Sequence, residues 1–279
     1  MLRILNLGAG VQSTTLYLWA IDGQLKIDRA IFADTGDEPE AVYKHLDFLL
    51  ALNGPSIDIV KACENSLGDN LVQGMNATGQ RHVSIPAFLS LGDGAAPALG
   101  RRQCTAEYKI RPIDQRVRQL CGLEKGQRCR EQLAVQIMGL SFDEPKRVAN
   151  VKGRFESIAW SKPEFPLFDE YMTRADCVNY LEKRLPNYEV PRSACVYCPF
   201  HSDEEWLRVK ESPTDWARAV EIDEAIRDKT SACTQDMRAA QYLHRSCLPL
   251  VQIDFKAKAL DKQGRINFST FDCEGMCGV

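Results

Sequence analysis

A glycine-containing turn near the N-terminus has the residue types of a phosphate-binding loop. An apolar segment ending at Leu7 leads into the turn, and three hydroxyl side chains follow where a helix is expected to begin. Glycines let backbone N–H groups approach an anion, and the positive end of a helix attracts it. The residues expected to bind phosphate are Gly8, Ala9, Gly10, Gln12, Ser13 and Thr14. The turn matches neither the Walker A nor the Gly-x-Gly-x-x-Gly pattern, so an ordinary strand-turn-helix start is the alternative.

Cysteines are the second group of residues suited to chemistry. The chain contains 11 of them, and an intracellular protein of this size does not need disulfide bonds. Cys195 and Cys198 form a Cys-x-x-Cys-Pro motif, and Cys273 and Cys277 lie close together near the end of the sequence. Four thiolates suffice for tetrahedral Zn²⁺ or for a [4Fe–4S] cluster, and the proline after the second cysteine favours the cluster. Cys104 is an alternative ligand that would complete a three-thiolate site with one open iron position. A dithiol redox pair or simple packing is the other interpretation.

Charged residues are expected at the same site. Asp34, Asp37 and Glu38 follow a predicted strand, and their oxygens could hold Mg²⁺ against a triphosphate. The alternative is that such acidic residues stabilise the positive end of the next helix. Gly139 and Asp143 follow a later predicted strand in the same way.

A basic cluster around Cys104 is the fourth candidate. It includes Arg102, Lys109 and Arg111, which could clamp a polyphosphate or a nucleic-acid backbone. A solvated helix face is the alternative, and it is the preferred interpretation for the neighbouring Arg116 and Arg118.

Short apolar runs between these candidates predict a parallel sheet. The predicted strands are Ile4–Leu7, Arg29–Ala33, Ile57–Val60 and Leu133–Met138. The segments between them are long enough for crossover helices, and two helices are expected over Thr14–Ala20 and Glu38–Leu52. We therefore expect an α/β fold with a doubly wound, mostly parallel sheet. Ligands bind such sheets beyond the carboxyl ends of the strands, where the turn and the carboxylates fall.

Composition indicates the setting in which this chemistry occurs. A chain of 279 residues suits one α/β domain over residues 1–190 and a smaller helical, cysteine-bearing region over residues 191–279. No apolar run approaches the length of a membrane span, so we expect a cytoplasmic protein without membrane contact. The net charge of −3 excludes a globally basic nucleic-acid binder. Any nucleic-acid contact would be local or supplied by partner proteins.

Several motifs together resemble the N-type ATP pyrophosphatases of the adenine nucleotide α-hydrolase superfamily. The turn at residues 8–13 is similar to their PP-loop, although Gln12 stands where the family usually has aspartate. Further segments are similar to the phosphoadenosine-phosphosulfate-reductase-like members: Phe32-Ala33-Asp34-Thr35-Gly36, Arg102-Gln103-Cys104-Thr105, Lys109-Ile110-Arg111-Pro112, Gly139-Leu140-Ser141 and Phe165-Pro166-Leu167. The resemblance is closest to the branch with Cys-x-x-Cys-Pro-Phe, which includes Dnd- and Ssp-type DNA phosphorothioation proteins and phage relatives.

This resemblance implies an enzyme that splits ATP into AMP and pyrophosphate and thereby activates an acceptor for sulfur insertion. Asp34, Thr35 and Gly139 would contact the nucleotide together with the loop, and Mg²⁺ would accompany ATP. Arg102, Lys109, Arg111 and Asp143 would be catalytic. The implied acceptor is nucleic acid, DNA before tRNA, and the implied sulfur source is a cysteine desulfurase or another donor.

The same residues are also consistent with three other kinds of protein: a phosphoadenosine phosphosulfate reductase, a tRNA thiolase and a non-catalytic nucleotide or metal sensor. Reduction of phosphoadenosine phosphosulfate ranks below sulfur insertion into nucleic acid, because the segment around Cys273 lacks the preceding glutamate and the following histidine of the reductases. A sensor would use a loop in which Gln12 allows ATP binding without hydrolysis.

Overall fold

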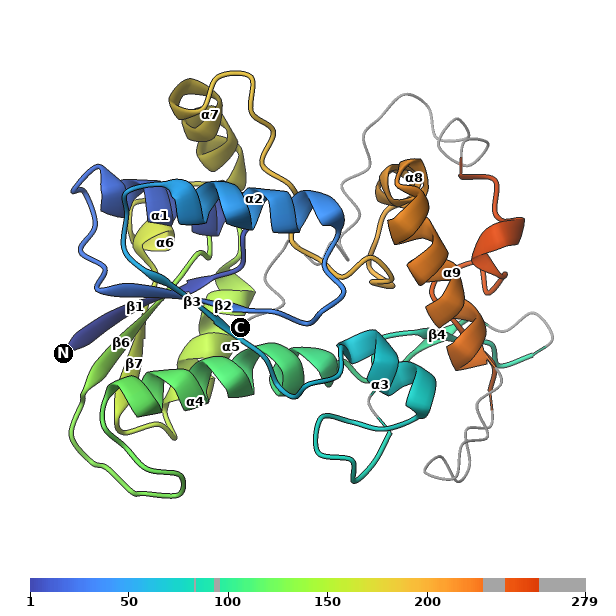
Figure 1. Cartoon of the computed structure of the whole chain (residues 1–279), viewed down its shortest axis with the longest axis horizontal. Helices are drawn as coiled ribbons and strands as arrows, with labels where there is room; N and C mark the ends of the chain where they lie inside the picture. The colour runs from blue at the N-terminus through green and yellow to red at the C-terminus, as the bar shows by residue number, and fades with distance from the viewer. Residues whose placement is uncertain (83, 93–95, 228–238, 256–279) are drawn as a thin grey trace.

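A five-stranded parallel sheet forms the centre of the larger part of the molecule (Figure 1). The structure is a computed structural model that describes residues 1–82, 84–92, 96–227 and 239–255. Its strand order is β3-β2-β1-β6-β7, and all neighbouring strands are parallel. The strands are β1 (Leu2–Leu7), β2 (Arg29–Ala33), β3 (Ile57–Val60), β6 (Ala134–Met138) and β7 (Ser161–Glu164). The prediction of an α/β fold with a mostly parallel sheet is confirmed.

The sequence predicted four of the five strands and missed the last one. β2 and β3 have the predicted bounds, whereas β1 begins two residues earlier and β6 one residue later than expected. β7 lies at an edge of the sheet and contains Pro163. Proline has no N–H to donate to a neighbouring strand, and an edge strand tolerates this because one of its sides has no neighbour. Its short sequence, Ser-Lys-Pro-Glu, lacks the apolar run by which the other strands are recognised.

Helices cover both faces of the sheet (Figure 1). On one face are α1 (Val11–Ile21), α2 (Glu40–Ala51), α6 (Pro166–Asp169) and α7 (Arg174–Arg184); on the other are α4 (Arg111–Leu120) and α5 (Pro145–Phe155). Side chains of one strand alternate between the two layers, because successive residues of a strand point to opposite faces. In β1, Leu5 and Leu7 pack with the α1 layer, whereas Ile4 packs with α4.

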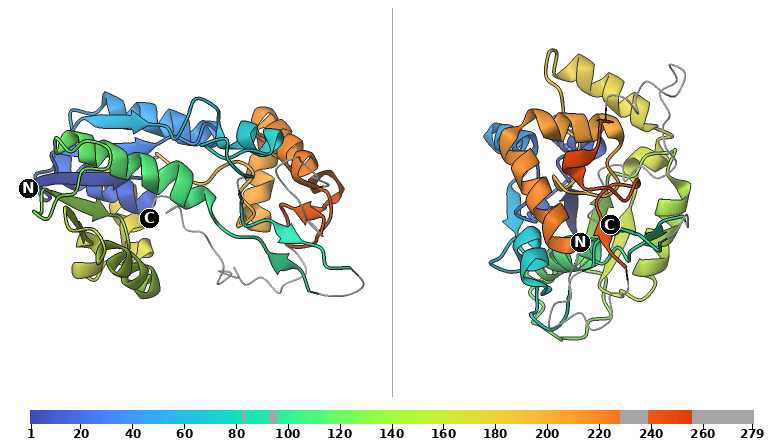
Figure 2. Two further views of the ribbon diagram at one scale, coloured as in Figure 1. Left: turned by 90° about the horizontal axis from the view of Figure 1, so that it is seen from below. Right: turned by 90° about the vertical axis from the view of Figure 1, so that its right-hand side faces the viewer.

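A second, smaller lobe lies beyond the carboxyl edge of the sheet (Figures 1 and 2). It contains α8 (Asp203–Glu211) and α9 (Pro213–Arg227), together with the turn at Leu250–Gln252. It also contains α3 (Leu67–Gln73) and a small antiparallel sheet of order β5-β4-β8. The strands of this sheet are β4 (Phe88–Leu89), β5 (Ala98–Leu99) and β8 (Gln241–Tyr242).

The core of the smaller lobe combines residues from both parts of the chain. Leu67 and Tyr108 pack in one buried cluster with Trp206 and Phe255. The lobe is therefore not made of residues 191–255 alone, because the segment between β3 and α4 supplies part of its core. Within the described ranges, none of the helices has both the length and the apolar character that crossing a membrane requires.

The strand order places a switch point between β1 and β6. From β1 the chain proceeds outward through β2 and β3, and it then returns to the other side of β1 with β6 and β7. The connections after β1 and β6 therefore diverge, and sheets of this type bind ligands in the crevice at the carboxyl ends of two such strands. Asn6 and Met138 are paired at this end, so residues 8–13 and 139–144 leave the sheet side by side.

Candidate nucleotide and cysteine site

The glycine turn after β1 leads directly into the first turn of α1. Gly10 is the N-cap, and Ala9 has a φ of 57°, a left-handed conformation that is uncommon for a residue with a side chain. The hydroxyl of Ser13 accepts hydrogen bonds from the N–H groups of Gly8 and Gly10, each at 3.2 Å. Ser13 thus shapes the loop from within. The first N–H groups of α1 have no acceptor inside the helix, so the turn presents a helix start suited to an anion.

The segment after β6 lies against this turn. A Cβ at Gly139 would come within 2.9 Å of the Ser13 nitrogen and 3.1 Å of the Gln12 carbonyl carbon. Only glycine allows the two segments to approach each other this closely. The Gln12 amide Nε2 donates to Glu144 Oε2 at 2.9 Å and to Ser141 Oγ at 3.2 Å. The two predicted nucleotide-binding segments are therefore joined.

The carboxylate that contacts the loop is Glu144, although Asp143 was the predicted catalytic residue. Glu144 is buried, whereas Asp143 is exposed and accepts a hydrogen bond from the backbone N–H of Arg174 at 3.3 Å. The sequence presents both residues in one acidic pair, and only their burial distinguishes them.

Thr14 points away from the turn and into the helix layer. Its hydroxyl is 2.8 Å from His45 Nε2, and the other ring nitrogen of His45 is 2.9 Å from the Tyr188 hydroxyl. Thr14 and His45 are both fully buried. Thr14 therefore holds α1 against α2, and its hydroxyl does not face the crevice as the sequence interpretation expected.

Burial lowers the pKa of His45 to about 4, so acid should destabilise the protein through this residue. The unfolded chain takes up a proton near pH 6.5, while the folded chain does not until about pH 4. Stability contributed by neutral His45 is thus present above about pH 6.5 and is lost as the pH falls, by on the order of 3 kcal/mol at about pH 4. Urea unfolding between about pH 7 and about pH 4.5 should show that the free energy of unfolding falls more steeply with decreasing pH in the wild type than in His45→Gln. An equal pH dependence of the two proteins would contradict this role of His45.

Asp34 and Thr35 leave β2 on the other side of β1, and each is held by several partners. Asp34 accepts hydrogen bonds from the Gly36 N–H and the Tyr43 hydroxyl, both at 2.8 Å, and it pairs with Lys61 at 3.2 Å. The Thr35 hydroxyl is 3.3 Å from Glu38 Oε1 and 3.4 Å from Cys195 Sγ. Thr35 therefore connects the carboxyl edge of the sheet to the Cys-x-x-Cys motif.

Lys109 and Glu38 form a buried ion pair beside Thr35. Their side chains are 8% and 0% exposed, and Lys109 Nζ is 2.8 Å from Glu38 Oε1. The other oxygen, Glu38 Oε2, is buried without a hydrogen-bond partner among the described residues. Lys109 is placed by a π-helical turn over Thr105–Ile110, a geometry frequent at functional sites. The α2 helix begins only at Glu40, so Glu38 does not serve the helix start.

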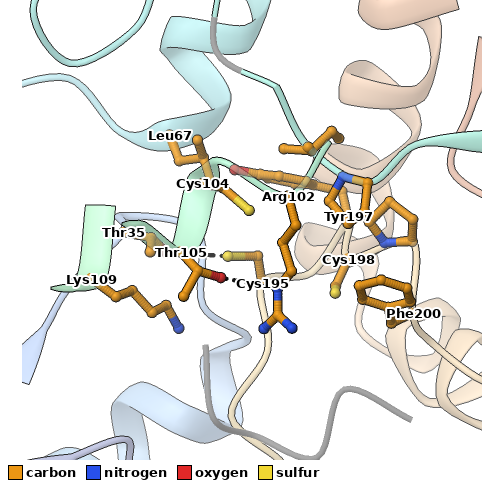
Figure 3. A pocket seen from close by; sticks show the side chains of 13 residues that line it. Thr35, Leu67, Arg102, Cys104, Thr105, Lys109, Cys195, Tyr197, Cys198 and Phe200 are labelled. Atoms are coloured by element: carbon orange, nitrogen blue, oxygen red, sulfur yellow. Dashed lines mark hydrogen bonds between the residues drawn. The ribbon is translucent and has the colours of Figure 1, made fainter. Parts of the chain in front are cut away.

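Three cysteines line one pocket next to this ion pair (Figure 3). Cys104 lies just before the π-helical turn, whereas Cys195 and Cys198 lie in the turn before α8. Arg102 and Lys109 line the same pocket, and their charged ends point to the same side in Figure 3. Thus the structure brings together the alternative three-cysteine set that the sequence suggested, together with two of the three predicted cations.

Arg102 is exposed and is held by the pocket wall. Its Nε donates to the Thr105 hydroxyl at 3.0 Å, and its guanidinium carbon lies 5.6 Å from the ring centroid of Phe200. By contrast, the third predicted cation, Arg111, is the exposed first residue of α4 and does not line the pocket.

Asp37 fixes the Cys-x-x-Cys turn to the sheet. Its carboxylate accepts hydrogen bonds from the Tyr197 hydroxyl at 2.9 Å and from Arg218 Nε of α9 at 2.8 Å. Its backbone carbonyl accepts the N–H of Val196 at 2.9 Å. The sequence interpretation placed Asp37 at a magnesium site or a helix start, whereas in the structure it joins the two lobes.

The predicted metal ligands lie only partly within the described residues. Among residues 1–82, 84–92, 96–227 and 239–255, no three His, Cys, Asp or Glu side chains are grouped closely enough to hold one metal ion. A [4Fe–4S] cluster makes a different demand, because each thiolate binds a separate iron atom. The predicted ligands Cys273 and Cys277 lie outside the described residues.

Ser193 is a site residue that the sequence did not indicate. It is 1% exposed, and its Oγ has no hydrogen-bond partner within the described part of the chain. A Cβ built on Gly10 would lie 3.6 Å from the Ser193 Cβ, so this serine covers the glycine turn. A buried hydroxyl without a partner among the described residues, beside a helix start suited to an anion, could donate a hydrogen bond to a phosphate oxygen.

Ser193→Ala should therefore separate stability from ligand binding. Removing an unpaired buried hydroxyl should leave the free energy of unfolding unchanged or raise it by up to about 1 kcal/mol. ATP affinity should fall by about 10- to 150-fold, the loss of one hydrogen bond to a charged group. Urea unfolding and calorimetric titration with ATP measure the two quantities. A variant that loses stability and keeps its ATP affinity would contradict the assignment.

No family model, curated protein or solved structure matches this chain in the comparisons with known proteins.

Proposed function

We propose that this chain is an ATP pyrophosphatase of the adenine nucleotide α-hydrolase type that activates a DNA backbone phosphate for sulfur insertion. One observation carries the proposal: the sheet edge that bears the glycine turn is joined to a three-cysteine pocket. Thr35 makes the junction through its contact with Cys195, and the Lys109–Glu38 pair lies beside it. An anion site and a thiolate site at the same edge of one sheet suit a reaction that combines ATP with sulfur.

The nucleotide would lie with its phosphates over the start of α1. An acceptor phosphate oxygen bonds to the α-phosphorus of ATP and pyrophosphate leaves. Hydrosulfide, released from the donor's persulfide by a thiol reductant, then bonds to the acceptor phosphorus and loses its proton, and AMP leaves with the former acceptor oxygen. Arg102 and Lys109 line the cysteine pocket, and they would stabilise the negative charge that develops on the phosphates. Such a reaction depends mainly on positioning and on cations.

The described residues fit Mg²⁺ only as an ion held largely by the nucleotide. Asp34 and Asp37 are committed to hydrogen bonds and ion pairs, whereas Glu38 Oε2 has no partner among the described residues. Magnesium is often bound by one or two carboxylates together with substrate phosphates, so a single free carboxylate oxygen is sufficient.

The proposed occupant of the pocket is an iron–sulfur cluster, with Zn²⁺ as the alternative. Cys104, Cys195 and Cys198 line the pocket from two segments of the chain. A cluster bound by three thiolates would keep one iron open to a sulfur atom. The chain's own contribution would be to hold Cys195 in place through Thr35 and Asp37.

The direct test measures pyrophosphate release from Mg²⁺ and ATP by the full chain, purified without oxygen, with and without DNA. We expect release that depends on DNA, and sulfur incorporation when a cysteine desulfurase is added. Cys104→Ser, Cys195→Ser and Cys198→Ser should each abolish incorporation and keep ATP binding. No release under any of these conditions would overturn the proposal.

A nucleotide sensor is the second candidate, and the position of Gln12 favours it. The amide is occupied by Glu144 and Ser141, so the loop offers no carboxylate where the resembling family usually has one. Tight ATP binding without turnover would support the sensor. Sulfite release from phosphoadenosine phosphosulfate that is lost in Cys273→Ser would instead support a reductase. Release that depends on tRNA in place of DNA would support a tRNA thiolase.

A further inference from the structure

An exposed aromatic pair stands at the carboxyl edge of the sheet, beside the proposed nucleotide crevice. Phe142 follows β6 in the segment that contains Gly139 and Glu144, and Tyr171 follows α6. Their side chains are 41% and 73% exposed, and their ring centroids are 5.1 Å apart. Phe168 supports Phe142 from the interior side of the cluster at 5.4 Å. Two large rings therefore offer their surfaces to solvent next to the site.

The backbone holds these two rings in place. The N–H of Phe142 donates to the carbonyl of Met172 at 2.7 Å, which ties the segment after β6 to the residue that follows Tyr171. Tyr171 has a φ of 56° because it is the left-handed residue that ends α6. Its N–H donates to the Phe168 carbonyl at 3.2 Å, and the N–H of Met172 donates to the Leu167 carbonyl at 2.8 Å, so the cap fixes the direction in which Tyr171 leaves the helix.

Positive charge lies along the adjoining helix. α5 begins three residues after Phe142, and its sequence, Pro-Lys-Arg-Val-Ala-Asn-Val-Lys-Gly-Arg-Phe, contains no acidic residue. Arg147 pairs with Glu144, and Arg154 pairs with Asp114, while Lys146 and Lys152 are exposed. Acidic residues Asp169 and Glu170 precede Tyr171, so the side suited to phosphates is the α5 side.

We propose that Phe142 and Tyr171 stack on an unpaired base of the acceptor nucleic acid, while Lys146 and Lys152 contact its phosphates. This inference rests on the proposed function, and it assigns the acceptor to a single-stranded or locally opened segment. Aromatic side chains bind bases of any sequence by stacking, and lysines add a salt-dependent attraction to the backbone. The base would sit on the same segment that carries Gly139, so its strand would pass close to the phosphates of ATP.

The test compares binding of a labelled single-stranded DNA of about 12 nucleotides to the wild type and to variants, by fluorescence anisotropy. Phe142→Ala and Tyr171→Ala should each weaken binding by about 5- to 150-fold, whereas Tyr171→Phe should retain wild-type affinity. Tyr171→Leu should weaken it as Ala does, because leucine is apolar but cannot stack. Lys146→Gln and Lys152→Gln should each reduce the slope of log affinity against log salt by about 0.7. Leu248→Ala, an exposed apolar residue of the smaller lobe, is the matched control.

Three outcomes would overturn the inference. They are wild-type affinity in both alanine variants, retained affinity in Tyr171→Leu, and an equal loss of ATP affinity, which would assign the rings to the adenine of ATP. Pyrophosphate release measured on the same samples distinguishes the two proposals. If the wild type releases pyrophosphate and the Phe142 and Tyr171 variants release it equally well, only the stacking proposal is overturned. If DNA binding depends on the two rings but no pyrophosphate is released, only the pyrophosphatase proposal is overturned.

Discussion

Replacing Lys109 with methionine should lower the free energy of unfolding by about 3–5 kcal/mol at neutral pH. Lys109 is paired with Glu38, whose side chain is fully buried. Without the ammonium group, Glu38 would remain as a buried carboxylate that accepts a hydrogen bond from the Thr35 hydroxyl at 3.3 Å but has lost its opposite charge. An uncompensated buried charge is among the most destabilising changes that one substitution can make. Urea unfolding followed by circular dichroism measures the loss.

The double variant Lys109→Met/Glu38→Gln is the matched control. It removes both charges, and we expect it to recover most of the lost stability, because a buried pair replaced by uncharged groups of similar size is close to neutral. Both variants should lose the pyrophosphate release that we expect of the wild type, since both lack Lys109, which also lines the pocket. A single variant within about 1 kcal/mol of the wild type would show that the pair is not buried in solution.

Gly139→Ala should reduce pyrophosphate release by about 100-fold or more. The added methyl group would lie 2.9 Å from the Ser13 nitrogen and 3.1 Å from the Gln12 carbonyl carbon. Both are backbone atoms, which cannot rotate away as a flexible side chain would. The end of β6 and the start of α1 must therefore separate, and a displacement of about 1 Å at a catalytic site costs this much in rate.

Gly153→Ala gives the matched comparison for that change. Gly153 lies within α5, and a Cβ there would have no neighbour within 4 Å. Alanine in a helix interior is preferred over glycine by about 0.5–1 kcal/mol, so this variant should be slightly more stable than the wild type and bind ATP equally well. Calorimetric titration with ATP should show weaker binding for Gly139→Ala alone. Equal affinity in the two variants would exclude Gly139 from the nucleotide site.

Local sequence patterns were sufficient to predict most of the sheet. β2 and β3 are short, apolar and bounded by polar turns, and the structure confirms their bounds. β7 was missed because Lys162 and Pro163 interrupt any apolar run, and only its pairing with β6 identifies it as a strand. The smaller lobe was missed in part for a related reason, since Leu67 and Tyr108 join its core by long-range packing.

The candidate site was predictable where chain order implies proximity. Gly139 and Gln12 were both expected at strand ends, and their contact follows from the pairing of β1 with β6. Burial was not predictable, because it depends on the residues that cover a side chain from elsewhere in the chain. For this reason the sequence did not predict that Glu144, rather than Asp143, contacts the loop, nor that Ser193 lies against the glycine turn.

By itself, the sequence determined the parallel α/β sheet, the glycine turn before α1 and the cysteine motif after residue 190, because each depends on neighbours in the chain. Only the tertiary structure decided which of these residues meet. It brought Cys104 into one pocket with Cys195 and Cys198, and it turned Asp37 into the clamp between the lobes. The physical reason is that ion pairs and thiolate sites form between groups brought close in space, and that closeness is set by packing across the whole fold.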